Sequence, residues 1–274
     1  MDEAGVKIRL AILHEHESVS YSAIALEASL AEIGVSGQVT IHSAAQGEFE
    51  SAIEALREAG YRGAFIANPH KTAAARMGQK FFLAREAVGV ANAMLFESTG
   101  IYVRNTEVAA LSEIVQDLEP GKALVIGAGQ AARSVISALF QHGWKPRVWN
   151  RNAMRTRVLQ TMFGRYGEIE LPSKADAGGC RLVVNASAAG LKIGETVPLE
   201  WRTVGPKAVV ADLALRRTPT ELVREARLRG LRTIDGMDIL SRTVSIGVQW
   251  FAGQRPEASK IREALAKSLA LSRN

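Results

Sequence analysis

Short apolar runs alternate along the chain with longer stretches whose apolar residues recur at the spacing of an α-helix. The short runs predict strands at residues 7–13, 38–42, 63–67, 123–128, 146–150, 181–186 and 208–214. The amphipathic stretches predict helices at 21–34, 48–60, 131–143 and 220–230, and they end in glycine. Because parallel strands need long crossover connections, this alternation predicts parallel sheets covered by helices.

The alternation forms two series, one before about residue 105 and one after about residue 121. A helix predicted over 105–121 joins them, and the last stretch predicts two helices separated by Gly253 to Pro256. We therefore expect an α/β protein of two lobes with a cleft between them. Residues 1–105 would form the first lobe, completed by the C-terminal helices of 241–274, and residues 106–240 would form a second lobe with a doubly wound sheet.

Composition places the chain among ordinary globular proteins. Of its 274 residues, 47% are hydrophobic and 23% are charged. No apolar run reaches the roughly 18 to 20 residues that a membrane helix needs. The N-terminus opens with acidic residues and lacks a small-residue cleavage site, so we expect no signal peptide. A single cysteine, Cys180, rules out an internal disulfide framework and suits a reducing compartment. We expect a cytoplasmic protein, either a monomer or a homodimer, without a membrane partner.

The net charge of +6 does not indicate a nucleic-acid partner. The arginines are scattered, and their densest group, at residues 224–232, alternates with apolar and acidic residues as a solvated helix face does. Local positive charge also attracts small anionic ligands. The charge therefore favours an anionic small molecule over nucleic acid.

A glycine motif stands between a predicted strand and a predicted helix in the second lobe. In the segment ALVIGAGQAARS, Gly127 permits a tight turn, Gly129 lets the backbone approach a pyrophosphate, and Ala132 permits close packing of helix on strand. The N-terminus of the helix would face the anion. The position between strand and helix makes the motif much stronger than glycine spacing alone. The predicted cofactor contacts of this loop are Gly127, Ala128, Gly129, Gln130 and Ala131.

The end of the next strand predicts which dinucleotide binds. An NAD site usually has an acidic residue there, roughly 20 residues after the glycines, to hold the ribose 2′-hydroxyl. This chain instead has Asn150, Arg151 and Asn152, followed by Arg155 one turn later. Two guanidinium groups without a carboxylate suit a 2′-phosphate. The sequence predicts NADP rather than NAD as the cofactor.

These motifs together resemble the shikimate/quinate dehydrogenase family over nearly the whole chain. The resemblance rests on the segments GAGQAAR, NRNAMR, VVNASAAGL and ADLALRRTPTELVREARLRG, which stand where the family has related motifs. It implies a catalytic first lobe and a Rossmann-type NADP-binding second lobe. It also implies further cofactor contacts at Asn185, Ser187, Leu213 and Gly236.

The resemblance also implies a substrate site in the first lobe. The family builds this site from an S-x-S segment, an N-x-T-x-P-x-K segment, two asparagine segments and a late glutamine. This sequence retains part of that set and replaces Asn, Thr and Gln by Phe65, Ala67 and Thr243. The expected substrate contacts are Ser18, Ser20, Phe65, Asn92, Asn105 and Thr243.

Lys71 and Glu107 stand where the family has a catalytic lysine–aspartate pair. Oxidation of an alcohol by hydride transfer releases a proton, which a positioned lysine can take up. The resemblance therefore implies that Lys71 carries the proton and that Glu107 assists it. Glutamate is one methylene longer than aspartate, and a misplacement of ~1 Å can cost around a hundredfold in rate.

The predicted function is an NADP(H)-dependent dehydrogenase that interconverts a cyclic alcohol and ketone, with an altered substrate pocket. The replacements at Phe65, Ala67 and Thr243 remove hydrogen-bonding groups, so we expect weak or absent activity on shikimate itself. Two alternatives stay open. One is an authentic shikimate or quinate dehydrogenase, and the other is a non-catalytic NADP-binding sensor.

The segment His14-Glu15-His16-Glu17 contains two histidines that would share a strand face. A metal site would need further ligands, and no cluster of them is evident, so we expect no metal. The rim of a substrate cleft and an ordinary loop both stay open for this segment. His70 beside Lys71 is expected to be a packing residue.

Overall fold

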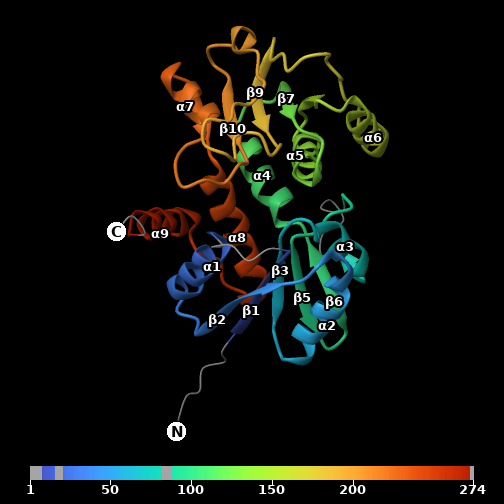
Figure 1. The fold of residues 1–274 in the computed structure, drawn as a ribbon, viewed down its shortest axis with the longest axis vertical. Coiled ribbons are helices and arrows are strands. Elements are labelled where there is room, and N and C mark those ends of the chain that lie inside the picture. The colour runs from blue at the N-terminus through green and yellow to red at the C-terminus, as the bar shows by residue number, and fades with distance from the viewer. Residues whose placement is uncertain (1–7, 16–20, 82–87, 272–274) are drawn as a thin grey trace. The chain divides into compact units, whose positions relative to one another are not determined.

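The computed structural model describes residues 8–15, 21–81 and 88–271. These form two compact units, Met1–Ala109 with Leu240–Asn274 and Ala110–Ile239, each shown with its helices and strands in Figure 1. The sequence places the first boundary after residue 105. The division after Ala109 keeps the first turn of α4 (Thr106–Gln116) with the first unit.

The first unit contains a mixed sheet with strand order β2-β1-β3-β5-β6-β4. Its strands are β1 (Ile8–His14), β2 (Gly37–Ser43), β3 (Gly63–Ile66), β4 (Lys80–Phe81), β5 (Ala93–Glu97) and β6 (Gly100–Arg104). Strand β1 runs parallel to β2 and β3, whereas β5 runs antiparallel to β3 and β6. The parallel pairing of β1 with β2 and β3 follows the prediction, and β5 adds an antiparallel strand that the sequence analysis missed. A tight connection through Ser98 and Thr99 joins β5 to β6, and antiparallel strands need no crossover.

Helices cover both faces of this sheet. They are α1 (Tyr21–Glu32), the short 3-10 helix η1 (Gln46–Glu48), α2 (Phe49–Glu58), α3 (Lys71–Met77), α8 (Gly236–Ala252) and α9 (Ala258–Leu271). Side chains of a strand alternate between the two faces, and β1 shows this clearly. Leu10 and Ile12 pack with residues of α1, α8 and α9, whereas Ala11 and Leu13 pack with residues of α2 and α3. The predicted break between the last two helices is confirmed, since α8 ends at Ala252 and α9 begins at Ala258.

Helix α8 packs directly on β3 through two glycines. A methyl group added at Gly63 would lie 2.5 Å from the Phe251 ring, and one added at Gly247 would lie 2.2 Å from the Phe65 ring. The rings of Phe65 and Phe251 meet edge to face, with their centroids 5.4 Å apart. The aromatic rings therefore fill the space that the missing side chains leave.

The second unit contains a wholly parallel sheet with strand order β11-β10-β9-β7-β8. Its strands are β7 (Lys122–Ile126), β8 (Lys145–Trp149), β9 (Cys180–Asn185), β10 (Val209–Asp212) and β11 (Arg232–Ile234). Its helices are α5 (Gln130–Gln141), α6 (Ala153–Phe163), the 3-10 helix η3 (Trp201–Thr203), α7 (Glu221–Leu228) and most of α4. Chain order changes direction at β7, whose neighbours are β9 and β8, as in doubly wound nucleotide-binding sheets.

Each strand that the apolar runs predict is present, with ends that differ by a residue or two. The sequence analysis missed β4 and β11, which have two and three residues and are too short to show a period. It also missed β5 and β6, because the Ser98-Thr99 connection carries no Asn-Gly or Asp-Gly turn signal. Within the described residues, no helix combines the length and the apolar character needed to span a bilayer.

The close approach of α8 to β3 predicts a specific cost for a methyl group at Gly247. Gly247→Ala would place it 2.2 Å from the Phe65 ring, so the ring or the helix must move. Overpacking costs roughly 1–3 kcal/mol, partly offset by the ~1 kcal/mol that alanine gains over glycine in a helix. We expect a net loss of unfolding free energy, measured by urea denaturation.

Gly47→Ala is the matched control, because no atom lies within 4 Å of a methyl group there. The double variant Gly247→Ala/Phe65→Leu should regain part of the loss, since the smaller side chain vacates the contested space. A Gly247→Ala protein as stable as the wild type would contradict the packing described for α8.

Candidate active site

Lys71 is the first residue of α3, directly after the loop that follows β3. Only 8% of the residue is exposed, and its Nζ atom lies 2.5 Å from Oε1 of Glu107. The Lys71 carbonyl accepts a hydrogen bond of 2.9 Å from the Ala91 amide, which fixes the start of α3 against the segment before β5. The two side chains that the sequence analysis paired are therefore in direct contact.

The first turn of α4 holds Glu107 in this position. The Asn105 side chain accepts from the Val108 amide at 3.1 Å and donates to the Val90 carbonyl at 3.2 Å. The Asn92 side chain accepts from the Thr106 amide at 2.7 Å, and its amide group lies 3.0 Å from the Thr106 hydroxyl. These buried bonds satisfy donors that a helix start leaves without a partner. Both asparagines thus anchor the helix that carries Glu107, and their contact with a substrate stays a prediction.

An ammonium group in contact with a carboxylate can exchange a proton with a bound molecule. Lys71 donates to Glu107, and a lysine ammonium has three donor hydrogens, so further donors remain for a ligand. The Glu107 side chain is 20% exposed and that of Lys71 is 10% exposed, which shields the pair from most of the solvent. The arrangement suits a proton-transfer group beside a reacting oxygen.

The other predicted substrate contacts differ in their surroundings. Phe65 is buried in the apolar cluster beneath α8, against Gly247 and Phe251. Thr243 on α8 is 5% exposed, and its hydroxyl has no hydrogen-bond partner among the residues that the structure describes. Ser18 and Ser20 lie outside the described residues. The structure therefore gives Phe65 a packing role and leaves Thr243 with an unused polar group.

His70 precedes Lys71 and is a packing residue, as expected. Its ring stacks on Phe49 with the centroids 5.1 Å apart, and its Nε2 atom lies 3.0 Å from the Ala44 carbonyl oxygen. Only 1% of His70 is exposed. The stacked ring holds the loop that ends at Lys71.

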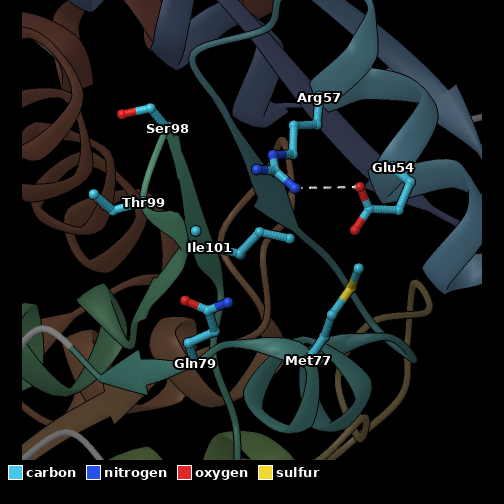
Figure 2. Close-up of a pocket in the computed structure, with 8 residues that line it drawn as sticks. Glu54, Arg57, Met77, Gln79, Ser98, Thr99 and Ile101 are labelled. Carbon is cyan, nitrogen blue, oxygen red and sulfur yellow. Dashed lines mark ion pairs between the residues drawn. The ribbon is translucent and has the colours of Figure 1, made fainter.

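A cavity of about 240 Å³ lies elsewhere in the first unit, around the β5–β6 connection (Figure 2). It is lined by Glu54, Arg57, Met77, Gln79, Ser98, Thr99, Gly100 and Ile101. Because β5 is antiparallel to β3, this connection lies near the amino end of β3, whereas Lys71 follows its carboxyl end. Arg57 and Glu54 form an ion pair of 3.6 Å in its lining. This cavity is separate from the lysine–glutamate pair.

The glycine loop of the second unit has the geometry that its sequence predicts. Gly127 has a φ of 119°, and a methyl group there would lie 2.7 Å from the Ala186 carbonyl oxygen. Gly129 caps α5, and a methyl group there would meet no atom within 4 Å. Ala132 is fully buried on the inner side of α5. The open face at Gly129 and the helix start beside it fit the phosphates of a dinucleotide.

The turn after β8 presents two arginines. The Asn152 side chain caps α6 by accepting from the Met154 amide at 3.0 Å, and the Asn150 side chain donates to the Asn152 carbonyl. Arg151 and Arg155 are exposed, and neither has an ion-pair partner among the residues that the structure describes. The two asparagines shape the turn, and the two arginines remain available for an anion.

The carboxyl ends of β9 and β10 meet in a buried network around Asn185. Its side chain donates to the Ala189 carbonyl and to Asp212, each at 2.8 Å. It accepts from the amide and the hydroxyl of Ser187, at 3.1 and 2.7 Å. The Leu213 amide donates to the Asn185 carbonyl at 3.0 Å. Asn185 thus shapes the loop that carries Ser187, and a direct bond from its side chain to the cofactor stays a prediction.

Asp212 is a buried carboxyl group that the sequence analysis did not single out. It accepts from the Thr220 hydroxyl at 2.6 Å and from the Ala214 amide at 3.0 Å. Burial raises the pKa of this carboxyl above its usual value, against the opposing effect of these hydrogen bonds, the one from Asn185 and the charge of Arg216. The sequence did hold a signal for a buried carboxyl group here, because an acidic residue ends the apolar run AVVAD.

Gly236 begins α8 at a tight contact, since a methyl group there would lie 2.6 Å from the Ala214 carbonyl oxygen. Because all five strands are parallel, the loops after β7, β8, β9, β10 and β11 all lie at the carboxyl edge of the sheet, where doubly wound folds bind nucleotides.

Within the described part of the chain, no group of three or more His, Cys, Asp or Glu residues could hold a metal ion.

Comparison with known proteins decides the family. A shikimate dehydrogenase (NADP(+)) of Mesorhizobium japonicum is 33% identical over 247 residues, which cover 86% of this chain and 87% of that protein. The chain belongs to the shikimate dehydrogenase family. No model of a protein family matches it. The names of such relatives agree with the predicted enzyme class, an NADP-dependent dehydrogenase that acts on a CH–OH group.

Solved structures of other proteins share the fold of this chain. A shikimate 5-dehydrogenase of Thermus thermophilus, in complex with NADP(H) and shikimate, aligns with a TM-score of 0.87 at 26% identity, covering 95% of this chain and 99% of that chain. A 5-ketofructose reductase of a Gluconobacter species aligns with a TM-score of 0.87 at 18% identity, covering 96% and 99%, which shows the fold alone. The predicted family and the predicted fold class are confirmed.

The free guanidinium groups predict the cofactor selectivity of this family member. Arg151→Ala and Arg155→Ala should each weaken NADP binding roughly tenfold to a hundredfold, because each removes a charge-assisted hydrogen bond worth about 1.5–3 kcal/mol. Binding of NAD, which lacks the 2′-phosphate, should change little. Titration of each cofactor into each variant measures the effect.

Arg157→Ala is the control for this experiment. Arg157 is an exposed residue of the same helix, and its position two residues after Arg155 turns it away from that face. Equal losses for NADP and NAD in the Arg151 variant would contradict a 2′-phosphate site at this turn.

The buried Asp212 carboxyl should make the free energy of unfolding depend on pH. Its raised pKa means that the native state binds the proton more tightly than the unfolded state does. Its contribution is therefore present below the unfolded pKa of about 4 and is lost as pH rises through the higher folded pKa. The measured quantity is the unfolding free energy of the wild type minus that of Asp212→Asn. This difference should become smaller as pH rises from about 4 through the folded pKa of Asp212.

Asp176→Asn is the control of opposite sign. The pKa of the Asp176 carboxyl is lowered, chiefly by a hydrogen bond from the Gly178 amide, so its contribution is lost as pH falls. Urea denaturation measures both differences, from about pH 4 to pH 8 for Asp212 and from about pH 5 down to about pH 2 for Asp176. A wild-type minus Asp212→Asn difference that does not vary with pH would overturn the account of the buried carboxyl.

Proposed function

We propose that this protein is an NADP(H)-dependent dehydrogenase that interconverts a cyclic alcohol and its ketone, with shikimate and 3-dehydroshikimate as the first candidate pair. The observation that supports it most directly is the contact between Lys71 and Glu107, at 2.5 Å, in a largely shielded position. A protein that only binds a dinucleotide would have no use for this pair. The names of the curated relatives support the same reaction class.

NADP, when bound, supplies the acceptor or donor of a hydride. The residues of this chain handle the proton. In reduction, the Lys71 ammonium donates a proton to the carbonyl oxygen as the carbon gains a hydride, and the C=O double bond becomes a C–O single bond. In oxidation, the hydroxyl proton returns to the Lys71 nitrogen. Glu107 holds that nitrogen in place through the hydrogen bond from Nζ to Oε1.

The substrate pocket supports a second candidate within the same reaction class. The Phe65 side chain cannot form a hydrogen bond, and its ring packs in the apolar core beneath α8. The Ala67 side chain has no polar group either. A substrate with fewer hydroxyl groups than shikimate would lose less on leaving water for such a pocket. A less polar cyclic alcohol is therefore the alternative substrate.

Lys71→Met should lower kcat by at least roughly a hundredfold, in line with the usual contribution of a positioned acid or base. Binding of NADP should not change, because the glycine loop and the arginines lie in the other unit. Glu107→Gln keeps the shape of the partner and should reduce kcat less than Lys71→Met does. The assay follows reduced nicotinamide with shikimate, quinate and a panel of cyclic alcohols, each with NADP and with NAD.

Lys174→Met is the control, since the Lys174 side chain is 73% exposed and pairs with Glu200 at the surface. Full activity of Lys71→Met on its best substrate would sink the assigned proton transfer. Cofactor binding without turnover of any alcohol in the panel would favour the sensor over the dehydrogenase. Turnover of a less polar alcohol alone would favour the second candidate.

A further inference from the structure

Strand β2 lies at an edge of the first sheet, with β1 on one side and, among the residues that the structure describes, no strand on the other (Figure 1). An open strand edge presents a row of backbone amides and carbonyls that can pair with another chain. Proteins usually protect such an edge by short length, charged side chains, proline or a covering segment. The edge strands of the two sheets differ in this protection.

The edge strands other than β2 carry it. Strand β4 has two residues and begins with Lys80, and β11 has three residues and begins with Arg232. Strand β8 contains Lys145, Pro146 and Arg147. Strand β2 has seven residues, of sequence GQVTIHS, and contains no proline, lysine, arginine or acidic residue. The first unit therefore has a long edge strand that lacks the usual safeguards.

The histidine of β2 adds no charge at neutral pH. Burial, and then the charge of Arg9, lower the pKa of His42 below its usual value. The His42 ring meets Tyr61 edge to face, with the centroids 5.6 Å apart, and its Nε2 atom lies 2.8 Å from the Thr40 hydroxyl oxygen. Two copies of this strand can therefore approach each other without repulsion between like charges on opposite residues.

The ladder between β1 and β2 shows which backbone groups face outward. The Ile8 amide donates to the Ser36 carbonyl, and the Ala44 amide donates to the His14 carbonyl. Because the bonds of a strand alternate between its two sides, the even-numbered residues of 36–44 bond to β1. The outward-facing amides and carbonyls are those of Gly37, Val39, Ile41 and Ser43. Within the described part of the chain, these backbone groups have no hydrogen-bond partner.

The same edge carries an exposed apolar side chain. Ile41 is 42% exposed, and the other large apolar side chains that are exposed in the described residues lie in the second unit. Val39, two residues earlier, is on the same face of the sheet and packs against the apolar cluster of α1, α8 and α9. Ile41 therefore extends this apolar face to the open edge of the sheet.

We propose that β2 is a dimer interface, at which it pairs antiparallel with β2 of a second copy of this chain. The pairing is centred on Thr40, the middle residue of the strand. Gly37 then lies opposite Ser43 of the second copy. Val39 lies opposite Ile41 of the second copy. This register brings the outward-facing residues of both strands into hydrogen-bonded pairs, with about eight bonds in all.

The side chains favour a second copy over a strand of another protein. Val39 opposite Ile41 is a pair of β-branched apolar residues, and the two-fold axis repeats it on the other side of the centre. On the opposite face of the sheet, the two Thr40 side chains meet at the axis. Two copies of β2 therefore match each other in length, in outward-facing backbone groups and in side-chain pairs. The proposal does not depend on the reaction that the protein catalyses.

The first test is the mass of the full chain in solution, measured by sedimentation equilibrium over a roughly hundredfold range of concentration. We expect the share of dimer to rise with concentration, because an interface built around one strand pair is small. Ile41→Lys places a charge in the interface. Ile41→Pro removes an outward-facing amide and leaves the amides that bond to β1 in place. Each should raise the Kd of the dimer at least roughly tenfold.

Ile193→Lys is the matched control for the added charge. Ile193 is 90% exposed and lies in the second unit, so this variant should dimerise as the wild type does. Far-UV circular dichroism checks that each variant is folded.

The second test determines the register by disulfide trapping. Opposite residues of an antiparallel pair that share no hydrogen bond have Cα atoms about 4.5 Å apart, which a disulfide can span. Thr40→Cys should therefore cross-link two chains under mild oxidation. Ser43→Cys is the matched control, because Ser43 lies opposite Gly37 and the two Ser43 residues would be about 20 Å apart. The native Cys180 is buried, so it should not cross-link.

The outcomes separate this inference from the proposed function. The mass of a single chain at every concentration would overturn the dimer, and turnover by that single chain would leave the dehydrogenase standing. A dimer that both Ile41 variants leave intact would also overturn it, since the interface would lie elsewhere. Cross-linking of Ser43→Cys as readily as Thr40→Cys would contradict the antiparallel register. The trapping experiment keeps Ile41 and therefore decides the matter where a substitution there impairs folding.

Discussion

The hydrogen bonds that Asn92 and Asn105 make with the first turn of α4 keep a glutamate against a lysine from a distant part of the chain. Lys71 follows β3 and Glu107 follows β6, and the sheet places β5 between those two strands. A carboxylate and an ammonium can stay paired away from most of the solvent only if both backbones are fixed, because their desolvation is costly. The antiparallel pairings of β5 with β3 and β6 supply that rigidity.

Helix α8 packs on β3 along the length of the strand. Gly63 and Gly247 let the helix approach, and the rings of Phe251 and Phe65 fill the gap between them. A helix from the end of the chain thereby packs against a strand from its beginning.

The second unit brings its functional loops together by a simpler rule. All five strands are parallel, so their carboxyl ends share one edge, and the loops after them carry the glycines, the arginines and the Asn185 network. The buried Asp212 carboxyl joins two of these loops by accepting from Asn185 and Thr220. Such a network fixes the backbone of the loops that carry it.

Local patterns in the sequence were sufficient for much of the architecture. Apolar runs marked the longer strands, glycines marked helix ends, and the strand–glycine–helix order of residues 123–143 marked the nucleotide loop, because each of these features depends on neighbouring residues alone. The pairing of Lys71 with Glu107 came from the resemblance to a family. The strands β5 and β6 stayed hidden because their connection lacks a turn signal.

Only the tertiary structure showed what the polar side chains do. Asn92 and Asn105 had the residue type of substrate ligands, yet their partners are the amides and hydroxyl of a helix start. Phe65 stood at a position expected to line a pocket, and its ring packs against Gly247, far away in sequence. The sequence determined the longer strands and the helices, the strand–glycine–helix loop of the second unit and the chemical character of the lysine–glutamate pair. Which polar atoms are used within the fold and which remain for a ligand depended on long-range contacts, which leave no local pattern in the chain.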